Sequence, residues 1–424
     1  MLERFLALTA AGPDAVALIE AESGRATTRA QLLERARQIA RRHAAGELVA
    51  VQLPNSVEFV ATFVAALIGR FTVMMIDRDE RDPARLIKHF GRLKPAATPD
   101  ARLIKLTSGS TGAPKGIVAS EANLEADCRN ICATMDIRAG DVNLGAVPMS
   151  HSYGFSNLVT PLLMQGTAIV ISNDYLPQSI MDHCNRYQVT VVPAVPMVFD
   201  HLAGAAKGHF TSVRTFISAG APLPASVSRR FRERFGLSVH TFYGCSECGG
   251  ITYDRQGASV ERGTVGSAMD GVALSIERSR LVIRGDNVSL GYLHDANTFE
   301  PFPPGRFRAD DLAEIRGDGE IVLTGRASEL INIAGRKVNP REVEQVLIQI
   351  DGVQEAKAYG EPAGARGEVV AAAIVARPDV TRDQVREFCR ARLSPHKVPR
   401  IIKLIDSIPV DDRGKVRRSA LAAL

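Results

Sequence analysis

The stretch Leu103-Ile-Lys-Leu-Thr-Ser-Gly-Ser-Thr-Gly-Ala-Pro-Lys-Gly116 joins a short apolar strand to a loop rich in glycine and hydroxyl groups. Glycines let backbone N–H groups wrap around an anion, hydroxyls add donors, and Lys115 adds a positive charge. The loop is not a P-loop of the Walker type, because Pro114 precedes the lysine and Gly116 follows it. Pro114 also disfavours a helical conformation at Ala113. We therefore expect a flexible loop over a polyphosphate.

On both sides of this loop, from Thr28 to about Pro224, short apolar strands alternate with helical patterns. Examples are the strands Leu48–Leu53, Val189–Val192 and Val213–Ile217, and the helix Ser226–Phe235. Such alternation predicts parallel sheets with helical crossovers, buried on both faces. The expected fold class is α/β.

After Tyr243 the pattern changes to short strands joined by turns that contain Gly and Asp, which predicts a β-rich subdomain. A smaller α+β unit follows, with helices expected at Pro340–Ile350 and Arg382–Leu393. We place the domain boundary at Arg326, giving an N-terminal domain over residues 1–326 and a C-terminal domain over residues 327–424.

Composition excludes several classes of protein. The 424 residues are 45% hydrophobic and 23% charged with a formal charge of +5, and no long run of like charges suggests a nucleic-acid-binding tail. The mild positive balance suits polyphosphate ligands, although a solvated surface explains it as well. The most apolar stretch, Phe59–Ile68, is too short to span a bilayer, so no integral membrane segment is expected.

The start of the chain, Met1-Leu-Glu-Arg4, opens directly into an ordinary segment, so no signal peptide is expected. The six cysteines form no disulfide framework, and the C-x-x-C of Cys245 and Cys248 has no second pair at metal-ligand spacing. We interpret them as reduced thiols rather than zinc ligands. These features predict a cytoplasmic protein.

The glycine-rich loop resembles the phosphate loop of the class I adenylate-forming superfamily. This superfamily includes acyl- and aryl-CoA synthetases, nonribosomal peptide synthetase adenylation domains and luciferases. Further motifs follow in the family's order, so that the resemblance covers about residues 28–420. They are Ser218-Ala-Gly-Ala-Pro-Leu223, Tyr243-Gly-Cys-Ser-Glu247, Arg306-Phe-Arg-Ala-Asp-Asp311, Gly325-Arg326, Gly335-Arg-Lys-Val-Asn-Pro-Arg-Glu-Val-Glu344 and Asp412-Arg-Gly-Lys-Val-Arg-Arg418.

The resemblance implies a nucleotide site. Asp311 is expected to bind the ribose diol, although the neighbouring Asp310 is a second candidate because the chain has Ala-Asp where the family usually has Thr-Gly. Arg326 is expected to reach ribose or phosphate, with pairing to a surface acid as the alternative. The implied nucleotide-binding residues are Thr107, Ser108, Gly109, Ser110, Thr111, Gly112, Lys115, Gly220, Ala221, Pro222, Tyr243, Gly244, Ser246, Asp311 and Arg326.

The resemblance also implies catalytic and metal-binding roles. Glu247 and Thr111 are the implied Mg²⁺ ligands, since this cation prefers oxygen donors. Lys415 is implied to stabilise charge on the α-phosphate during adenylation. Glu247, His151 and Lys415 are the expected catalytic residues. For Glu247 the alternative is an exposed acid after a turn, for His151 a histidine packed at a strand end, and for Lys415 a solvated surface lysine.

The segment Pro148–Asn157 resembles the wall of the family's acyl pocket. It contains no aspartate to pair with a substrate ammonium, which argues against free amino acids. Aryl and aliphatic acids both stay open. Gly249 and Gly250 are expected to leave space at the pocket. The expected pocket residues are His151, Ser152, Phe155, Cys245 and Gly249.

The resemblance further implies that the small C-terminal domain is mobile and rotates between two half-reactions. The hinge is expected at Ser328, with Glu329 sharing the role. Gly335, Arg336 and Lys337 are expected at the mouth of a tunnel for the thiol. That thiol belongs either to coenzyme A or to the phosphopantetheine of an acyl carrier protein, and an acidic carrier protein is an alternative partner for the two basic side chains.

These features predict an acid–thiol ligase that uses ATP and Mg²⁺ to activate a small-molecule carboxylic acid as its acyl-adenylate, then transfers the acyl group to coenzyme A. An acyl–carrier-protein ligase is the alternative, and a non-catalytic nucleotide-binding protein is a remoter one. Whether the chain forms a homodimer is left open.

Overall fold

The computed structural model describes residues 1–91, 100–108, 114–205, 207–333, 336–362, 368–409 and 421. The chain divides into two compact units. The first comprises Met1–Ser275, Val282–Arg308 and Ile315–Val322, and the second comprises Ile276–Leu281, Ala309–Glu314 and Leu323–Leu424. The boundary expected at Arg326 stays a prediction.

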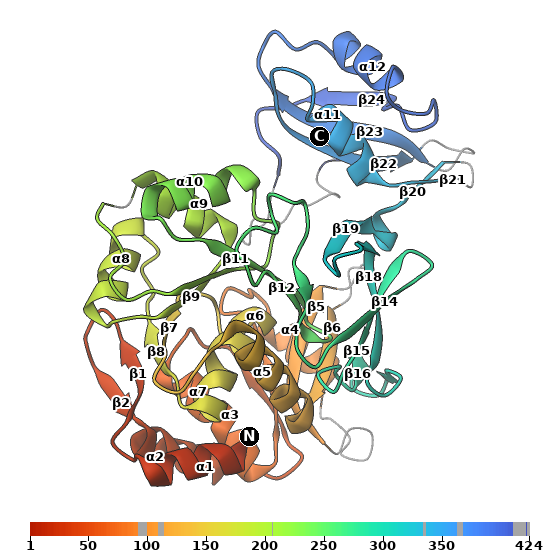
Figure 1. The fold of residues 1–424 in the computed structure, drawn as a ribbon. Helices are drawn as coiled ribbons and strands as arrows, with labels where there is room; N and C mark the ends of the chain where they lie inside the picture. Colours follow the sequence, from red (N-terminus) through yellow and green to blue (C-terminus); the bar gives the residue numbers. More distant parts are fainter. Residues whose placement is uncertain are drawn as a thin grey trace. The chain divides into compact units, whose positions relative to one another are not determined.

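A nine-stranded sheet forms the centre of the first unit (Figure 1). Six adjacent strands, from β11 to β1 in the sheet, are parallel, as the alternating pattern predicted. The spatial order is β13 (Ser267–Ala268), β12 (Gly249–Tyr253), β11 (Val239–Cys245), β10 (Thr215–Ser218), β9 (Val191–Ala194), β7 (Val142–Gly145), β8 (Ala168–Ile171), β1 (Val16–Glu20) and β2 (Ala26–Thr28).

Both faces of this sheet are buried, because successive residues of its strands enter different cores. In β8, Ile169 and Ile171 join one apolar cluster and Val170 joins the other. The helices α8 (Pro177–Arg186), α9 (Pro196–Ala205) and α10 (Ala225–Phe235) supply the cluster on the second face. The first face is covered by α1 (Leu2–Ala11), α2 (Arg29–Ala40), α3 (Val57–Gly69) and α7 (Thr160–Gln165).

A six-stranded sheet also packs into the cluster on the first face. Its strands β3, β4 and β5 are parallel, whereas β6, β16 and β17 pair antiparallel. The helix α4 (Pro83–Phe90) covers its outer face through Phe90. The order is β17 (Phe299–Pro301), β16 (Gly291–Leu293), β6 (Pro114–Ser120), β5 (Ala101–Ser108), β4 (Thr72–Met75) and β3 (Leu48–Val51).

The helix α5 (Glu121–Met135) begins directly after β6. Ser120 accepts a hydrogen bond from the N–H of Asn123, and the Asn123 side chain accepts one from the N–H of Ser120. This reciprocal cap fixes the start of the helix.

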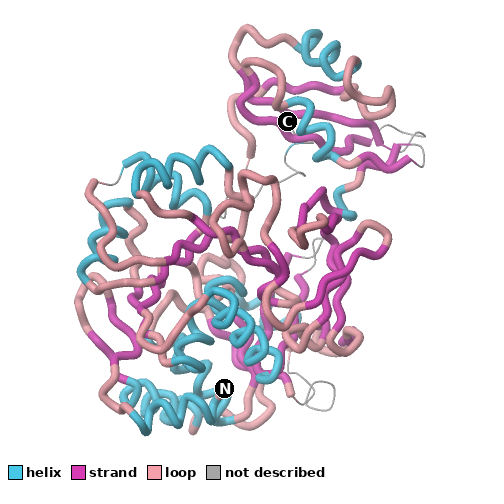
Figure 2. The backbone as a smooth tube through the Cα atoms, viewed as in Figure 1, coloured by secondary structure: helices cyan, strands magenta, loops and turns pink. Residues whose placement is uncertain are grey.

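The β-rich segment contributes a four-stranded sheet (Figure 2). Its order is β14 (Ala273–Glu277), β15 (Arg280–Arg284), β18 (Arg306–Ile315) and β19 (Ile321–Arg326).

The rest of the second unit is a three-stranded sheet with two helices packed on one face. Val370 and Ile374 lie under α11 (Pro340–Leu347) and α12 (Arg382–Arg390), while Ala371 and Ala373 face the opposite side. Both helices end before the expected Ile350 and Leu393, because each is followed by hydrogen-bonded turns rather than by further helix. The remaining elements are the hairpin β20 (Ile331–Ile333) and β21 (Arg336–Val338), and the strands β22 (Val353–Pro362), β23 (Glu368–Ala376) and β24 (Ile401–Leu404).

Among the residues that the structure describes, no helix has both the length and the apolar character needed to cross a membrane.

Candidate active site

Several predicted site segments follow the carboxyl ends of the parallel strands. The segment with His151 follows β7, Gly220–Pro222 follow β10, and Ser246 and Glu247 follow β11. The strand order reverses at β7, which has β8 on one side and β9 on the other. In open α/β sheets, ligands bind outside the carboxyl ends of the strands at such a reversal. Topology therefore brings together motifs that are far apart in the sequence.

The glycine-rich loop connects two antiparallel strands. Thr107 lies opposite Lys115 in the β5–β6 ladder, and the backbone of Ser108 ends β5. A P-loop of the Walker type would lead from a strand into a helix. Here the loop leads from one strand into another, which agrees with the expectation that it is not a P-loop of that type. The predicted residues Gly109, Ser110, Thr111 and Gly112 lie outside the described residues.

Tyr292, which the sequence analysis did not select, connects the loop to the glutamate motif. Its hydroxyl donates a 2.7 Å hydrogen bond to Glu247 Oε1, and the Lys115 ammonium lies 5.0 Å from the centroid of its ring. Burial, together with the neighbouring Glu247 carboxylate, raises the pKa of Tyr292 far above its usual value, so the phenol stays a donor. A cation and a carboxylate from two separate motifs therefore meet at one tyrosine.

Glu247 lies in the tight turn between β11 and β12, which also carries Ser246. Gly244 must be a glycine, because a Cβ on it would lie 2.3 Å from the carbonyl oxygen of Gly249. The carbonyl of Glu247 accepts a 2.9 Å bond from the N–H of Ser289. The predicted Tyr243 lies half-buried near the end of β11. This backbone holds the glutamate at the edge of the sheet.

Gly249 was expected to leave space in the acyl pocket, but a carboxylate fills the space beside it. A Cβ on Gly249, which has a φ of +68°, would come within 2.2 Å of the Asp127 side chain. Asp127 accepts hydrogen bonds from Ser156 Oγ at 2.6 Å and from the N–H of Gly250 at 2.8 Å. The buried aspartate thus ties α5 to the turn that carries Glu247.

His151 makes a contact that the sequence analysis did not anticipate. Its Nε2 lies 2.9 Å from Oδ2 of Asp77, which follows β4. The carboxylate orients the imidazole ring. No local pattern marked Asp77, since the two residues come from different sheets.

After His151 the chain forms a helical segment that contains a π-helical turn, Phe155–Val159, of the kind often found at functional sites. Tyr153 donates a 2.8 Å hydrogen bond to the carbonyl of Ile217, just before the predicted adenine segment. Ser152 Oγ is buried and has no hydrogen-bond partner among the described residues. Phe155 packs edge-on against Phe63 in the core, at 4.7 Å between ring centroids.

In the second unit, the two predicted ribose ligands contact each other. Arg326 Nε lies 3.1 Å from Asp311 Oδ1. Asp310, the other candidate, accepts bonds from Arg280 Nη2 at 2.7 Å and from the N–H of Ser328 at 3.1 Å, and the Ser328 hydroxyl donates to it as well. Asp310 is therefore engaged with the expected hinge, while Asp311 is paired with the expected nucleotide arginine.

The expected tunnel residues Arg336 and Lys337 are exposed on β21. Gly335 and Lys415 lie outside the described residues.

Comparison with known proteins places the chain in a family. The model of the AMP-binding enzyme family matches residues 77–293, and that of the AMP-binding enzyme C-terminal domain matches residues 342–415. A feruloyl-CoA synthase from Amycolatopsis sp. is 28% identical over 391 residues, which are 88% of this chain and 78% of the relative. A sulfoacetate–CoA ligase from Cupriavidus necator is 29% identical over 345 residues, which are 77% of this chain and 68% of the relative.

A solved structure shares the fold. It is O-succinylbenzoate coenzyme A synthetase from Bacillus subtilis in complex with ATP and magnesium ion. The TM-score is 0.83 at 23% identity, with 99% of this chain and 98% of the other covered. Sequence motifs, fold and family models agree, and the chain therefore belongs to the AMP-binding enzyme family.

Proposed function

We propose that this chain is an ATP-dependent acid–thiol ligase. In the first step, the carboxylate of an acid attacks the α-phosphorus of ATP, forming an acyl-adenylate and releasing pyrophosphate. In the second, the sulfur of coenzyme A attacks the acyl carbon and AMP leaves. The observation that carries the proposal is the meeting of Lys115 and Glu247 at Tyr292, which joins the phosphate loop to the expected metal ligand.

The groups around Tyr292 fit a metal–phosphate site. Tyr292 bonds to Oε1 of Glu247, and no hydrogen bond to Oε2 is found among the described residues, which leaves Oε2 for a cation. Among the described residues no cluster of three or more His, Cys, Asp or Glu forms a metal site. This agrees with a Mg²⁺ ion that takes one or two protein oxygens and fills its shell with phosphate oxygens and water. Bound by Glu247 and Thr111, it would neutralise charge on the phosphates.

The proposed nucleotide ligands come from several of the sequence motifs. In the proposed roles, Gly220, Ala221 and Pro222 contact adenine, and Asp311 accepts hydrogen bonds from the ribose diol. Arg326 pairs with Asp311 and orients its carboxylate. This pairing supports Asp311 over Asp310, whose oxygens are occupied by Arg280 and Ser328.

The acid is held beside His151. The Asp77–His151 pair gives the imidazole a fixed orientation at the expected entrance for the substrate carboxylate. The relatives named above act on feruloyl and sulfoacetate groups, neither of which is a free amino acid. They support the expectation that the substrate has no α-ammonium group.

Coenzyme A is the proposed acceptor, because the named relatives are coenzyme A ligases and synthases. Arg336 and Lys337 are exposed and carry the charge needed to meet its phosphates. Ser328, whose backbone N–H and hydroxyl both donate to Asp310, is the proposed hinge. A cytoplasmic location is part of the proposal.

The test is exchange of labelled pyrophosphate into ATP across a panel of carboxylic acids, followed by product analysis with coenzyme A and with a phosphopantetheinylated carrier protein. We expect exchange with at least one acid and a thioester with coenzyme A. Absence of exchange with every acid would refute the ligase. A thioester on the carrier protein alone would replace coenzyme A as acceptor.

The two steps can be separated with Lys415→Ala. This change should abolish adenylation, since the lysine is proposed to stabilise charge on the α-phosphate. Thiolysis of a supplied acyl-adenylate should persist, because that phosphorus is no longer attacked. Equal loss of both steps would contradict the assigned role.

A further inference from the structure

Lys105 is a buried lysine on β5, in the strand that leads into the glycine-rich loop. Its side chain is 4% exposed. Side chains alternate between the faces of a strand, so Lys105 shares a face with Leu103, which packs into the core between the two sheets, and with Thr107. A lysine is almost never buried without a partner, because its charge loses its hydration.

No partner for the Lys105 ammonium is found among the described residues: no hydrogen bond and no ion pair reaches it there. Burial lowers the pKa of Lys105, while Asp127, Cys245, Glu247 and Cys248 act in the opposite direction. Lys105 therefore lies within electrostatic reach of the turn between β11 and β12.

Asp127 does not satisfy this lysine by direct contact. One of its oxygens accepts from Ser156 and the other from the N–H of Gly250. Burial raises the pKa of Asp127, and these two bonds counteract the increase. Asp127 thus offsets the charge of Lys105 at a distance and leaves the three ammonium donors available.

Along β5, Lys105 lies further from the glycine-rich loop than Thr107 does. Thr107, which is expected to contact the nucleotide, lies two residues further along, or about 6.8 Å along the strand. Cys245, on which Lys105 acts, is an expected pocket residue. In the same proposed pocket, Ser152 Oγ is also buried and without a partner in the described part of the chain. Buried polar groups left in this state usually complete their bonds with a ligand or water.

We propose that Lys105 is a specificity determinant that binds a second carboxylate of the substrate, so that this ligase acts on dicarboxylic acids. The inference rests on the proposed function. A second carboxylate would accept hydrogen bonds from the ammonium in a site shielded from water, where charge-assisted bonds are strongest. An acid with an apolar tail would leave the ammonium buried and unpaired, and the site would reject it.

The test compares matched monocarboxylic and dicarboxylic acids of equal chain length, over a series of lengths, by pyrophosphate exchange. In the unaltered enzyme, kcat/KM for the best dicarboxylic acid should exceed that for its monocarboxylic partner by about 100-fold. In Lys105→Met this preference should disappear through a higher KM for the dicarboxylic acid. The KM for ATP and the Mg²⁺ titration should change by no more than about twofold.

Two further variants keep the result interpretable. Lys88→Met removes an exposed lysine from α4 and should leave the preference intact. Lys105→Met with Asp127→Asn removes both buried charges, so a folding defect caused by an uncompensated aspartate is avoided; it should also lose the preference.

A preference for monocarboxylic acids in the unaltered enzyme, or a dicarboxylate preference that survives both Lys105 variants, would overturn this inference alone. Exchange with no acid at all would overturn the ligase and this inference together. If Lys105→Met changed only the Mg²⁺ titration, the lysine would instead be a positioning residue for Glu247, and the specificity role would be wrong.

Discussion

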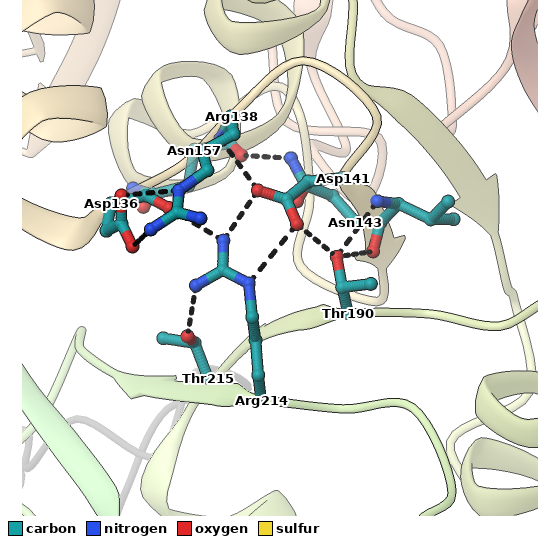
Figure 3. Close-up of polar contacts among 9 residues, drawn as sticks. Asp136, Arg138, Asp141, Asn143, Asn157, Thr190, Arg214 and Thr215 are labelled. Atoms are coloured by element: carbon teal, nitrogen blue, oxygen red, sulfur yellow. Dashed lines mark hydrogen bonds and ion pairs between the residues drawn. The ribbon is translucent and has the colours of Figure 1, made fainter.

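Polar groups at the amino ends of the strands of the nine-stranded sheet are hydrogen-bonded far more completely than those at the carboxyl ends. At the amino ends of β7, β9 and β10, Asp141 accepts bonds from Arg214, from the N–H of Arg138 and from Thr190 Oγ1 (Figure 3). Arg214 reaches both of its oxygens, at 2.6 and 3.3 Å. At the carboxyl ends, Glu247 has one side-chain partner and Ser152 Oγ has none among the described residues.

This difference distinguishes a buried charge that stabilises the fold from one that can bind a ligand. Burial raises the pKa of Asp141, but the bonds from Arg214, Arg138 and Thr190 outweigh it, so its pKa lies below the usual value. Such a saturated carboxylate has no capacity left for a ligand, and it stabilises the fold. At the carboxyl ends, Glu247 and Ser152 keep unused hydrogen-bonding capacity in the described part of the chain, as a ligand site requires. Perturbed ionisation alone would not have distinguished the two.

The largest expected effect is a loss of activity, caused by a change at the carboxyl ends of the strands. Glu247→Gln should lower pyrophosphate exchange by about 100-fold or more, because an amide replaces the proposed Mg²⁺ ligand. The Mg²⁺ concentration for half-maximal rate should rise, while thermal stability stays close to that of the unaltered protein. Glu261→Gln, at an exposed glutamate paired with Arg232, is the matched control. An unchanged metal titration in Glu247→Gln would argue against the metal role.

The next largest effect is a loss of stability, expected from a change at the amino ends of the strands. Arg214→Met should lower the free energy of unfolding by about 2 kcal/mol, because it leaves the buried Asp141 with fewer partners. Chemical denaturation measures this loss, and the exchange rate per folded molecule should not change. Arg138→Met, which breaks an exposed pair with Asp136, should have no measurable effect on stability. A large loss of activity in Arg214→Met would contradict a purely structural role for the groups at the amino ends of the strands.

A smaller effect is expected at Tyr292. Tyr292→Phe keeps the ring beside Lys115 but removes the hydrogen bond to Glu247. We expect about a tenfold lower exchange rate, because the carboxylate loses one positioning bond. Tyr187→Phe also removes one hydroxyl bond, to the carbonyl of Ala21, and should leave the rate per folded molecule unchanged. Equal rates in both variants would place Tyr292 among structural residues.

The smallest effect is a pH dependence of stability at Asp141. Its folded pKa is lowered, so its contribution is fully present above its unfolded pKa of about 4 and is lost as pH falls through the folded value. The free energy of unfolding should therefore fall faster with acid in the unaltered protein than in Asp141→Asn, and the two should converge once the pH is below the folded pKa of Asp141. Parallel curves down to low pH would contradict the assigned pKa shift.

Much of the fold followed from local patterns. Alternating apolar strands and helices indicated the parallel sheets, since strands buried on both faces must be short and apolar. The glycine-rich loop and the Tyr243–Glu247 segment stood out because backbone turns and anion binding need particular residue types. The start of helix α5 is a weaker signal, because Ser120 and Asn123 form its cap without the usual Glu or Gln at the third position.

The contacts within the site could not be derived in this way. Tyr292 reaches Glu247 and Lys115 because β16 pairs with β6, a pairing between segments more than a hundred residues apart. Asp77 meets His151, and Asp127 fills the space beside Gly249, through the packing of separate sheets and helices. The residue types and their order in the sequence indicate the class of reaction, because a phosphate-binding loop needs glycines, hydroxyls and a lysine close together in the chain. Which side chains complete the site depends on strand pairing and packing, which are long-range and leave no local signal.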